Sequence, residues 1–169
     1  MRRGPALARA AGLGIVSGLA GVAAMTAVEK VEQRFSRRPD SYMPAHTLGR
    51  VLGLSRPDAD SWGRNMAMHW GNAVPLGAAR GVMAAANLRG PWVAAMHAPM
   101  RLAWDQTLEN LTGAGAPPWT WPRDELVIDL AHKALFSLAT GAVADALIDP
   151  LAGTSAERRL LRTRLKGRA

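Results

Sequence analysis

The first long apolar segment of the chain carries its clearest structural signal. Residues 10–28, AAGLGIVSGLAGVAAMTAV, contain no charged side chain. A helix of nineteen residues extends about 28 Å, close to the ~30 Å hydrocarbon core of a bilayer. Basic residues precede the segment at Arg2, Arg3 and Arg9. The pattern predicts a membrane-spanning helix; a cleaved signal peptide and a buried helix of a soluble bundle are the alternatives.

Beyond this segment, apolar and polar positions recur at helical spacing, and prolines and glycines separate the periodic stretches. Pro39 is expected to end the first helix, because the residue before a proline is pushed out of the α region. A short amphipathic helix and three further long helices are predicted over residues 44–54, 55–88, 92–111 and 122–148. The fold class is therefore all-α, a membrane helical bundle of about four long helices plus the short amphipathic helix. One helical membrane domain is expected over residues 1–156, followed by a basic cytoplasmic tail over 157–169.

Local signals refine the ends of the predicted helices. Ser55 and Asp58 resemble a capping box, so the second long helix is expected to begin there. Pro75 is expected to kink that helix. Two tryptophans, Trp119 and Trp121, lie on the Pro-rich loop before the last helix. Indole rings favour the membrane–water interface, although ordinary packing under a loop explains them equally well.

Small residues form one face of the first helix. Gly14 and Gly18 make a G-x-x-x-G pair, and Gly21 extends it. Small residues at this spacing let a second helix approach closely in lipid. We expect this face to pack against another helix, in this chain, in a second copy or in a larger membrane complex.

Each of the last three long helices carries a polar stripe at i, i+4, i+7 or i, i+4, i+8 spacing. Lipid tolerates ionisable groups only where they face the bundle interior or water. The stripes therefore predict an interior polar cluster, with Arg80 and Arg101 paired to Asp105, Glu109 or Asp129. If the helices are soluble, the stripes are instead solvated faces. The members of the predicted cluster are His69, Asn72, Arg80, His97, Arg101, Asp105, Glu109, Asp129 and His132.

The histidines of this cluster allow two sharper hypotheses. Asp129 and His132 lie on adjacent turns, and with His69 and His97 they are weak candidate metal ligands. The same groups could relay a proton or ion, because histidine titrates near neutral pH. No cofactor is predicted. The chain has no Cys, no G-x-S-x-G context and no phosphate-binding loop, which argues against thiol, serine-nucleophile and nucleotide chemistry.

The charge distribution bears on topology. The chain has 21 Lys and Arg against 13 Asp and Glu, and the excess is concentrated in the tail, where no aromatic residue is interleaved. We read the tail as facing anionic lipid and expect no nucleic-acid partner. Basic residues at both ends place both termini in the cytoplasm and favour an even number of spans. Six Lys and Arg residues between positions 29 and 60 oppose this topology, and a mean hydropathy of −0.03 is low for four spans.

Several short motifs resemble the YagU-like family of small bacterial inner-membrane proteins. The similar parts are the Gly-rich segment GLGIVSGLAGVAA, the sequence His69-Trp70-Gly71-Asn72, and a Gly–Pro–Pro loop followed by an acid and a histidine. In that last part the matching residues are Gly115, Pro117, Pro118, Trp121, Pro122, Glu125 and His132. The resemblance implies an integral membrane protein and no established activity.

These observations predict a small protein of the bacterial cytoplasmic membrane whose main partner is the lipid bilayer. The leading interpretation is a non-catalytic structural or interaction protein with an interior ionic cluster. A proton or ion conduit, sensor or metal-binding membrane protein is the first alternative. A soluble helical protein anchored by its N-terminal helix is the second.

Overall fold

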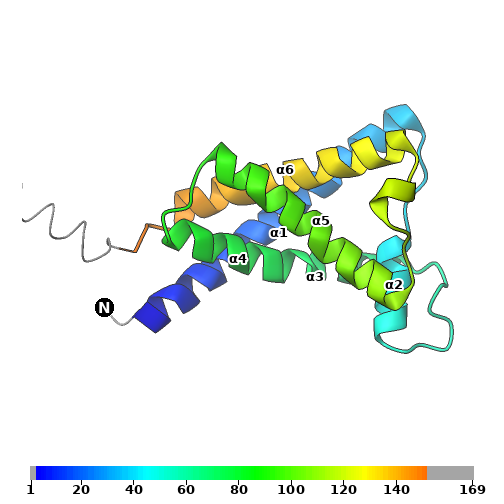
Figure 1. The fold of residues 1–169 in the computed structure, drawn as a ribbon, viewed down its shortest axis with the longest axis horizontal. Helices are drawn as coiled ribbons and strands as arrows, with labels where there is room; N and C mark the ends of the chain where they lie inside the picture. The colour runs from blue at the N-terminus through cyan, green and yellow to red at the C-terminus, as the bar shows by residue number, and fades with distance from the viewer. Residues whose placement is uncertain (1–2, 152–169) are drawn as a thin grey trace, which may run out of the picture.

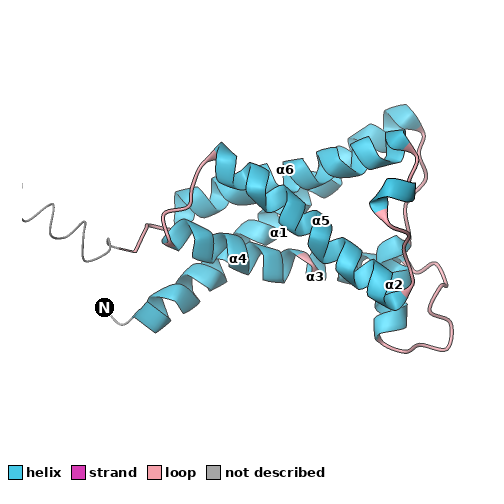
Figure 2. Cartoon of the chain, viewed as in Figure 1, coloured by secondary structure: helices cyan, strands magenta, loops and turns pink. Residues whose placement is uncertain are grey.

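The computed structural model describes residues 3–151 as an all-α fold, as predicted (Figure 1, Figure 2). The predicted basic tail, 157–169, lies outside the described residues. Within the described part there are six α-helices and one 3-10 turn. They are α1 (Arg3–Ser36), α2 (Met43–Val51), α3 (Trp62–Gly71), α4 (Ala73–Ala85), α5 (Pro91–Thr112), η1 (Pro118–Thr120) and α6 (Arg123–Leu147).

The long helices run back and forth between two ends of the molecule (Figure 1). The terminal end holds the start of α1, the end of α4, the start of α5 and the end of α6. The loop end holds the end of α1, the helices α2 and α3, the end of α5 and the start of α6. The described chain therefore begins and finishes at the same end. The helix α1 makes its most extensive contacts with α4 and then with α6.

Glycines allow the close packing of α1 on α4. A Cβ placed on Gly14 would lie 2.7 Å from the Cα of Gly81, and one placed on Gly18 would lie 2.9 Å from the Cα of Gly77. Both separations are too short for a side chain, so the two backbones touch along this seam. Gly21 packs on α6 in the same way, against Thr140 and Phe136. The predicted glycine face therefore packs helices within this chain, and its three glycines are buried.

The predicted helix over 55–88 is two helices in the structure. The chain breaks at Asn72, which ends α3 and begins α4. Pro75 has no N–H to donate to the carbonyl oxygen of Gly71 four residues earlier, so the interruption at Asn72 falls where Pro75 was expected to disturb the helix. The Ser55 capping box was wrong. The cap of α3 is Ser61, whose hydroxyl accepts a hydrogen bond from the backbone N–H of Arg64 at 3.4 Å.

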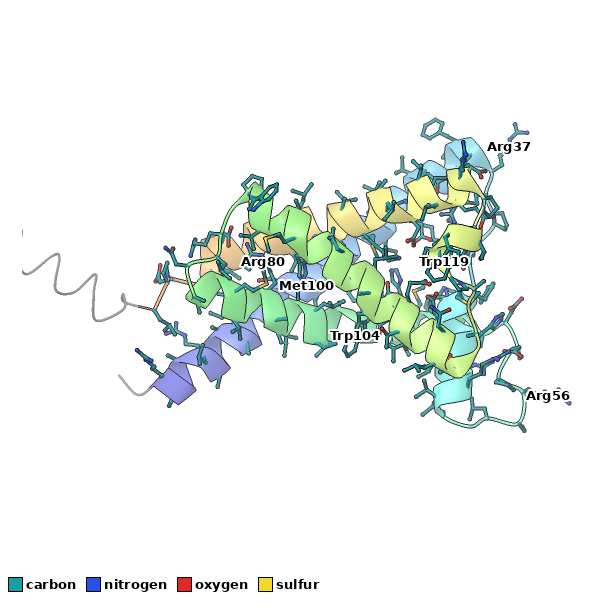
Figure 3. The ribbon with its side chains drawn as sticks, in the orientation of Figure 1. Arg37, Arg56, Arg80, Met100, Trp104 and Trp119 are labelled. Carbon is teal, nitrogen blue, oxygen red and sulfur yellow. The ribbon has the colours of Figure 1, made fainter. Side chains whose placement is uncertain are left out.

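The outer surface of the bundle is apolar along the helices. On α5, Trp92, Met96, Met100 and Trp104 repeat every fourth residue and are exposed; Met100 and Trp104 are labelled in Figure 3. Pro99 interrupts the hydrogen bonding of α5 on this exposed side. Similar exposed rows run along the other long helices: Val16, Leu19, Val28, Val31 and Phe35 on α1, and Val127, Leu130, Leu138 and Leu147 on α6.

The interior shows the opposite character. Its fully or almost fully buried side chains include Arg80, His97, Arg101, Asp105 and Lys133. Buried hydrophobic residues form only small clusters, one around Ala84 and Ala144 and another around Val22 and Phe136. Among the described helices, α1 and α6 are long and apolar enough to cross a membrane.

Candidate functional site

A chain of ion pairs joins α5 and α6 in the middle of the molecule. Arg101 Nε donates to Asp105 Oδ2 at 2.9 Å, one helical turn away on α5. Lys133 Nζ on α6 lies 3.5 Å from the same Asp105 oxygen and also donates to Asp129 Oδ1. Arg101, Asp105 and Lys133 are each less than a tenth exposed. The pairing follows from i, i+4 spacing on each helix and from the side-by-side packing of the two helices.

Neighbouring groups complete the surroundings of this chain. Asn72, at the break between α3 and α4, donates through Nδ2 to Asp105 Oδ1 at 3.3 Å. Asn72 Oδ1 accepts from Trp104 Nε1 at 3.2 Å. The guanidinium of Arg101 lies over the ring of Phe136, 4.6 Å from its centroid. Asp105 therefore receives hydrogen bonds from both sides, whereas Arg101 rests largely on an aromatic face.

The histidines do not form one site. His97 stacks on Phe136 with ring centroids 5.8 Å apart, and its Nε2 donates to the carbonyl oxygen of Leu76 at 3.1 Å. His69 Nε2 lies 3.1 Å from the hydroxyl of Thr26 on α1. Within residues 3–151, no three His, Asp or Glu residues gather as a metal ion would require. The four weak metal candidates, His69, His97, Asp129 and His132, therefore do not form a metal site in the described part of the chain.

Arg80 has a different partner from those predicted. It is fully buried near the terminal end, and its Nη2 donates to Asp145 Oδ1 on α6 at 2.7 Å (Figure 3). Asp145 Oδ2 accepts from the backbone N–H of Gly90 at 2.8 Å. Arg89 donates to the carbonyl oxygens of Ile148, at 2.6 Å, and of Asp145. The prediction that Arg80 pairs with Asp105, Glu109 or Asp129 was wrong, because α4 places it beside the last turns of α6.

Asp145 itself had a signal in the sequence. It is the only charged residue between Lys133 and Ile148, within the apolar part of α6. A lone charge in such a segment has to find an interior partner. The polar stripe predicted on the last helix ends at His132, so it did not include Asp145.

A cavity of about 330 Å³ opens between the helices toward the loop end. It is walled by α1, α2, α3, α5 and α6 and by the segments that precede α2 and α6. Seven of the nine predicted cluster residues line it, whereas Arg80 and His97 do not. The seven are His69, Asn72, Arg101, Asp105, Glu109, Asp129 and His132. The predicted cluster did not include Glu29, Asn65 and Lys133, which also line the cavity.

Some polar atoms of the cavity residues are left without a partner. Arg101 Nη1 and Asp129 Oδ2 are both buried from solvent and form no hydrogen bond within the described chain. Among the described residues, the Glu109 carboxylate is bonded only to an amide, since its Oε2 accepts from Gln106 Nε2 at 2.8 Å. Buried polar atoms are nearly always satisfied in folded proteins, so these two atoms indicate a missing donor and acceptor.

Ion pairs also fix the segments around the mouth of the cavity. Arg50 on α2 forms a two-bond contact with Asp58, at 2.8 and 2.9 Å, and donates to the carbonyl oxygen of Gly113 at 2.8 Å. The Arg50 guanidinium lowers the pKa of the Asp58 carboxyl. Lys30 likewise pairs with Asp40 and lowers its pKa. The contacts of Arg50 tie the loop before α3 to the end of α5.

Comparisons of the chain with protein family models, with curated proteins and with solved structures find no match. The resemblance to the YagU-like family therefore stays a prediction.

Proposed function

We propose that this is an integral protein of the bacterial cytoplasmic membrane with four crossings and both termini in the cytoplasm. The crossings are α1, α3 with α4, α5, and α6. The observation that carries the proposal is the inverted distribution of side chains. Large apolar groups are exposed along the outside of the helices, while two arginines, a lysine and an aspartate are buried in the interior. A soluble protein of this size buries its large apolar side chains instead.

Helix lengths agree with this placement. The 25 residues of α6 and the 22 residues of α5 extend about 37 and 33 Å, enough for a bilayer core of ~30 Å. The segment from Trp62 to Ala85, which joins α3 and α4, has a similar length. The helix α1 is longer than a bilayer requires, and its charged last turns extend beyond the apolar segment 10–28.

In this setting the interior ion pairs hold the helices together. Each charge would cost about 3 kcal/mol at the bilayer centre on insertion scales, so neutralisation inside the bundle favours one arrangement of helices. The pair Arg80–Asp145 links α4 to α6, and the pair Lys133–Asp105 links α6 to α5. This supports a non-catalytic role in structure or interaction as the leading function.

The cavity favours a second candidate, a sensor or conduit for a polar solute. His69, His132 and Asp129 line the cavity together. The seam of glycines closes α1 on α4 toward the terminal end. This arrangement supports a pocket at the loop end more than a continuous channel.

Alkaline carbonate extraction and cysteine labelling test the membrane placement. The wild-type chain is Cys-free, so single cysteines report without background. We expect Ser55→Cys and Ala116→Cys, at the loop end, to react with an impermeant maleimide added outside intact cells. Asn87→Cys should react only after the membrane is permeabilised, and Leu138→Cys, on the exposed apolar face of α6, should react only after denaturation.

Two results would overturn the proposal. One is release of the wild-type protein into the carbonate supernatant. The other is equal labelling of Leu138→Cys and Ser55→Cys in native membranes, which would place the outer face of α6 in water. Release of the bundle after removal of residues 1–36 would favour the anchored soluble alternative only if the remainder stays folded.

A further inference from the structure

We propose that the loop-end cavity binds a small zwitterion, a molecule with one acidic group and one ammonium group, of which an α-amino acid is the simplest class. The acidic group would bind Arg101 and the ammonium group would bind Asp129. This inference goes beyond the proposed function, because the cavity lies inside the bundle whatever surrounds the outer surface.

The donor side of the site is Arg101. Its side chain is 3% exposed and lines the cavity. Only Nε reaches Asp105, while Nη1 is buried without a partner in the described chain. A guanidinium is suited to binding a carboxylate or phosphate through two nitrogens. A buried donor left unpaired is costly, so a ligand oxygen at this position would stabilise the site.

The acceptor side is Asp129, which lines the same cavity. Its Oδ1 accepts from Lys133, and its buried Oδ2 has no partner within residues 3–151. A series of contacts joins the two sides, because Asp105 contacts Arg101 and Lys133, and Lys133 contacts Asp129. A small molecule bound among these side chains would meet both the donor and the acceptor.

The charge balance of the walls disfavours simpler ligands. Six carboxylates line the cavity: Glu29, Asp40, Asp105, Glu109, Glu125 and Asp129. Four cationic side chains line it: Lys30, Arg38, Arg101 and Lys133. A simple anion would meet this excess of carboxylates, and a simple cation would leave Arg101 unsatisfied. A zwitterion satisfies both, and Glu29 and Glu125, which join none of the ion pairs in the described residues, add attraction for its ammonium group.

The size and the apolar walls restrict the ligand further. A volume of about 330 Å³ lies at the small end of ligand pockets, which range over about 300–1,000 Å³. Met25, Met66, Met68 and Leu108 supply apolar surface. An amino acid with an aliphatic side chain fits these walls. The phosphoethanolamine headgroup of a lipid has the same pair of charges, so the experiment has to separate the two sources.

The test is isothermal titration of the full-length protein in detergent with matched probes. L-Leucine carries both charges, 3-methylbutylamine lacks its carboxylate, and 4-methylpentanoate lacks its ammonium. We expect saturable binding of L-leucine and about tenfold or weaker binding of each analogue, because each loses one charge-assisted contact. Short-chain phosphatidylethanolamine is compared with short-chain phosphatidylglycerol. Binding of the first alone, without L-leucine, would assign the site to a lipid headgroup.

Variants locate the binding. Asp129→Asn should weaken binding of the zwitterion about tenfold while leaving the fold intact, because Lys133 keeps Asp105 as a partner. The matched control is Asp124→Asn on the first turn of the same helix, outside the cavity lining, which should bind like the wild type. Arg101→Lys keeps the charge beside Asp105 and should weaken the carboxylate contact.

Three results would contradict the proposal. A cavity that holds only water would show no saturable binding of L-leucine or phosphatidylethanolamine, and the proposal would then be wrong. It would also be wrong if an analogue with one charge bound as tightly as L-leucine, or if Asp124→Asn and Asp129→Asn weakened binding equally. Failure of carbonate extraction would affect the membrane placement alone, so the two proposals fail separately.

Discussion

The two ends of this molecule handle buried charge in opposite ways. At the terminal end, glycine contacts bring helices together, and the fully buried Arg80 is paired with Asp145 in a tightly enclosed space. Toward the loop end, α5 and α6 diverge (Figure 1), and several charges share a network beside a cavity. Arg80 has no second carboxylate within reach in the described residues, whereas the cavity lets several charged groups, water or a ligand interact with one another. Removing an interior charge should therefore lower the free energy of unfolding more at the terminal end than at the loop end.

The largest effect is expected from breaking the enclosed pair. Asp145→Ala leaves the guanidinium of Arg80, which is 0% exposed, without its carboxylate. We expect the free energy of unfolding in detergent to fall by about 3–5 kcal/mol, as when one member of a buried pair is removed. The double variant Arg80→Met with Asp145→Ala should recover part of that loss. A cost for Asp145→Ala below that of the double variant would contradict the pairing.

A single methyl group at the glycine seam should have the next largest effect. Gly14→Ala places a Cβ against the backbone of α4, and we expect it to cost about 2–3 kcal/mol through forced separation of the helices. Gly12→Ala, on the same helix, meets no atom of the described chain within 4 Å. It should stabilise the helix slightly, because alanine is the better helix former. Thermal unfolding of the two variants side by side would show opposite signs, and equal shifts would contradict the seam.

A charge removed beside the cavity should cost less. Lys133→Met takes one partner from Asp105 and one from Asp129, yet Asp105 keeps Arg101 and Asn72. We expect a loss of about 1–2 kcal/mol, in the range of one hydrogen bond to a charged group. Chemical unfolding under the conditions used for Asp145→Ala gives the comparison directly. A loss of unfolding free energy as large as that of Asp145→Ala would show that the cavity does not lower the cost of removing a charge.

The smallest effect is expected for the exposed ion pair between Arg50 and Asp58 at the loop end. Because Arg50 lowers the pKa of Asp58 in the folded protein, its stabilisation is present above the ordinary value of 3.8 and is lost as pH falls through the lower folded value. Hydrogen exchange of the backbone amides of residues 52–60 should therefore become faster only when the pH falls below the ordinary pKa of 3.8. The increase is measured after correction for the pH dependence of exchange in an unfolded chain. Asp58→Asn should remove the transition. Arg56→Ala is the control, since that side chain extends away from the bundle (Figure 3) and should leave the transition unchanged.

Local features of this fold were predictable because local periodicity encodes them. The apolar segment 10–28 and the helices around it follow from spacing, prolines and glycines. The contact of Arg101 with Asp105 follows from i, i+4 geometry on one helix. Helix ends were less predictable: Ser55 and Ser61 are both suitable caps, and tertiary contacts of the loop between them decide which is used.

The rest of the site depends on how distant helices align. The pairing of Arg80 with Asp145 spans 65 residues, and no spacing rule links the two. The cavity exists because α5 and α6 diverge, which is a property of packing rather than of any one segment. His97 shares a stripe with Arg101, yet it lies on the packed side of Phe136 rather than in the cavity. Sequence periodicity identified most of the polar residues of the site, but it did not predict which of them contact one another.

Pro99 gives α5 a mechanical property that neither neighbouring helix has. It lacks the N–H that would close the ladder to the preceding turn, so the helix is weakest to bending there. The half before Pro99 carries His97 and is held by α4 and α6, and the half after it carries Arg101, Asp105 and Glu109. A small change of angle at this one residue would widen or narrow the cavity while the glycine seam stays still.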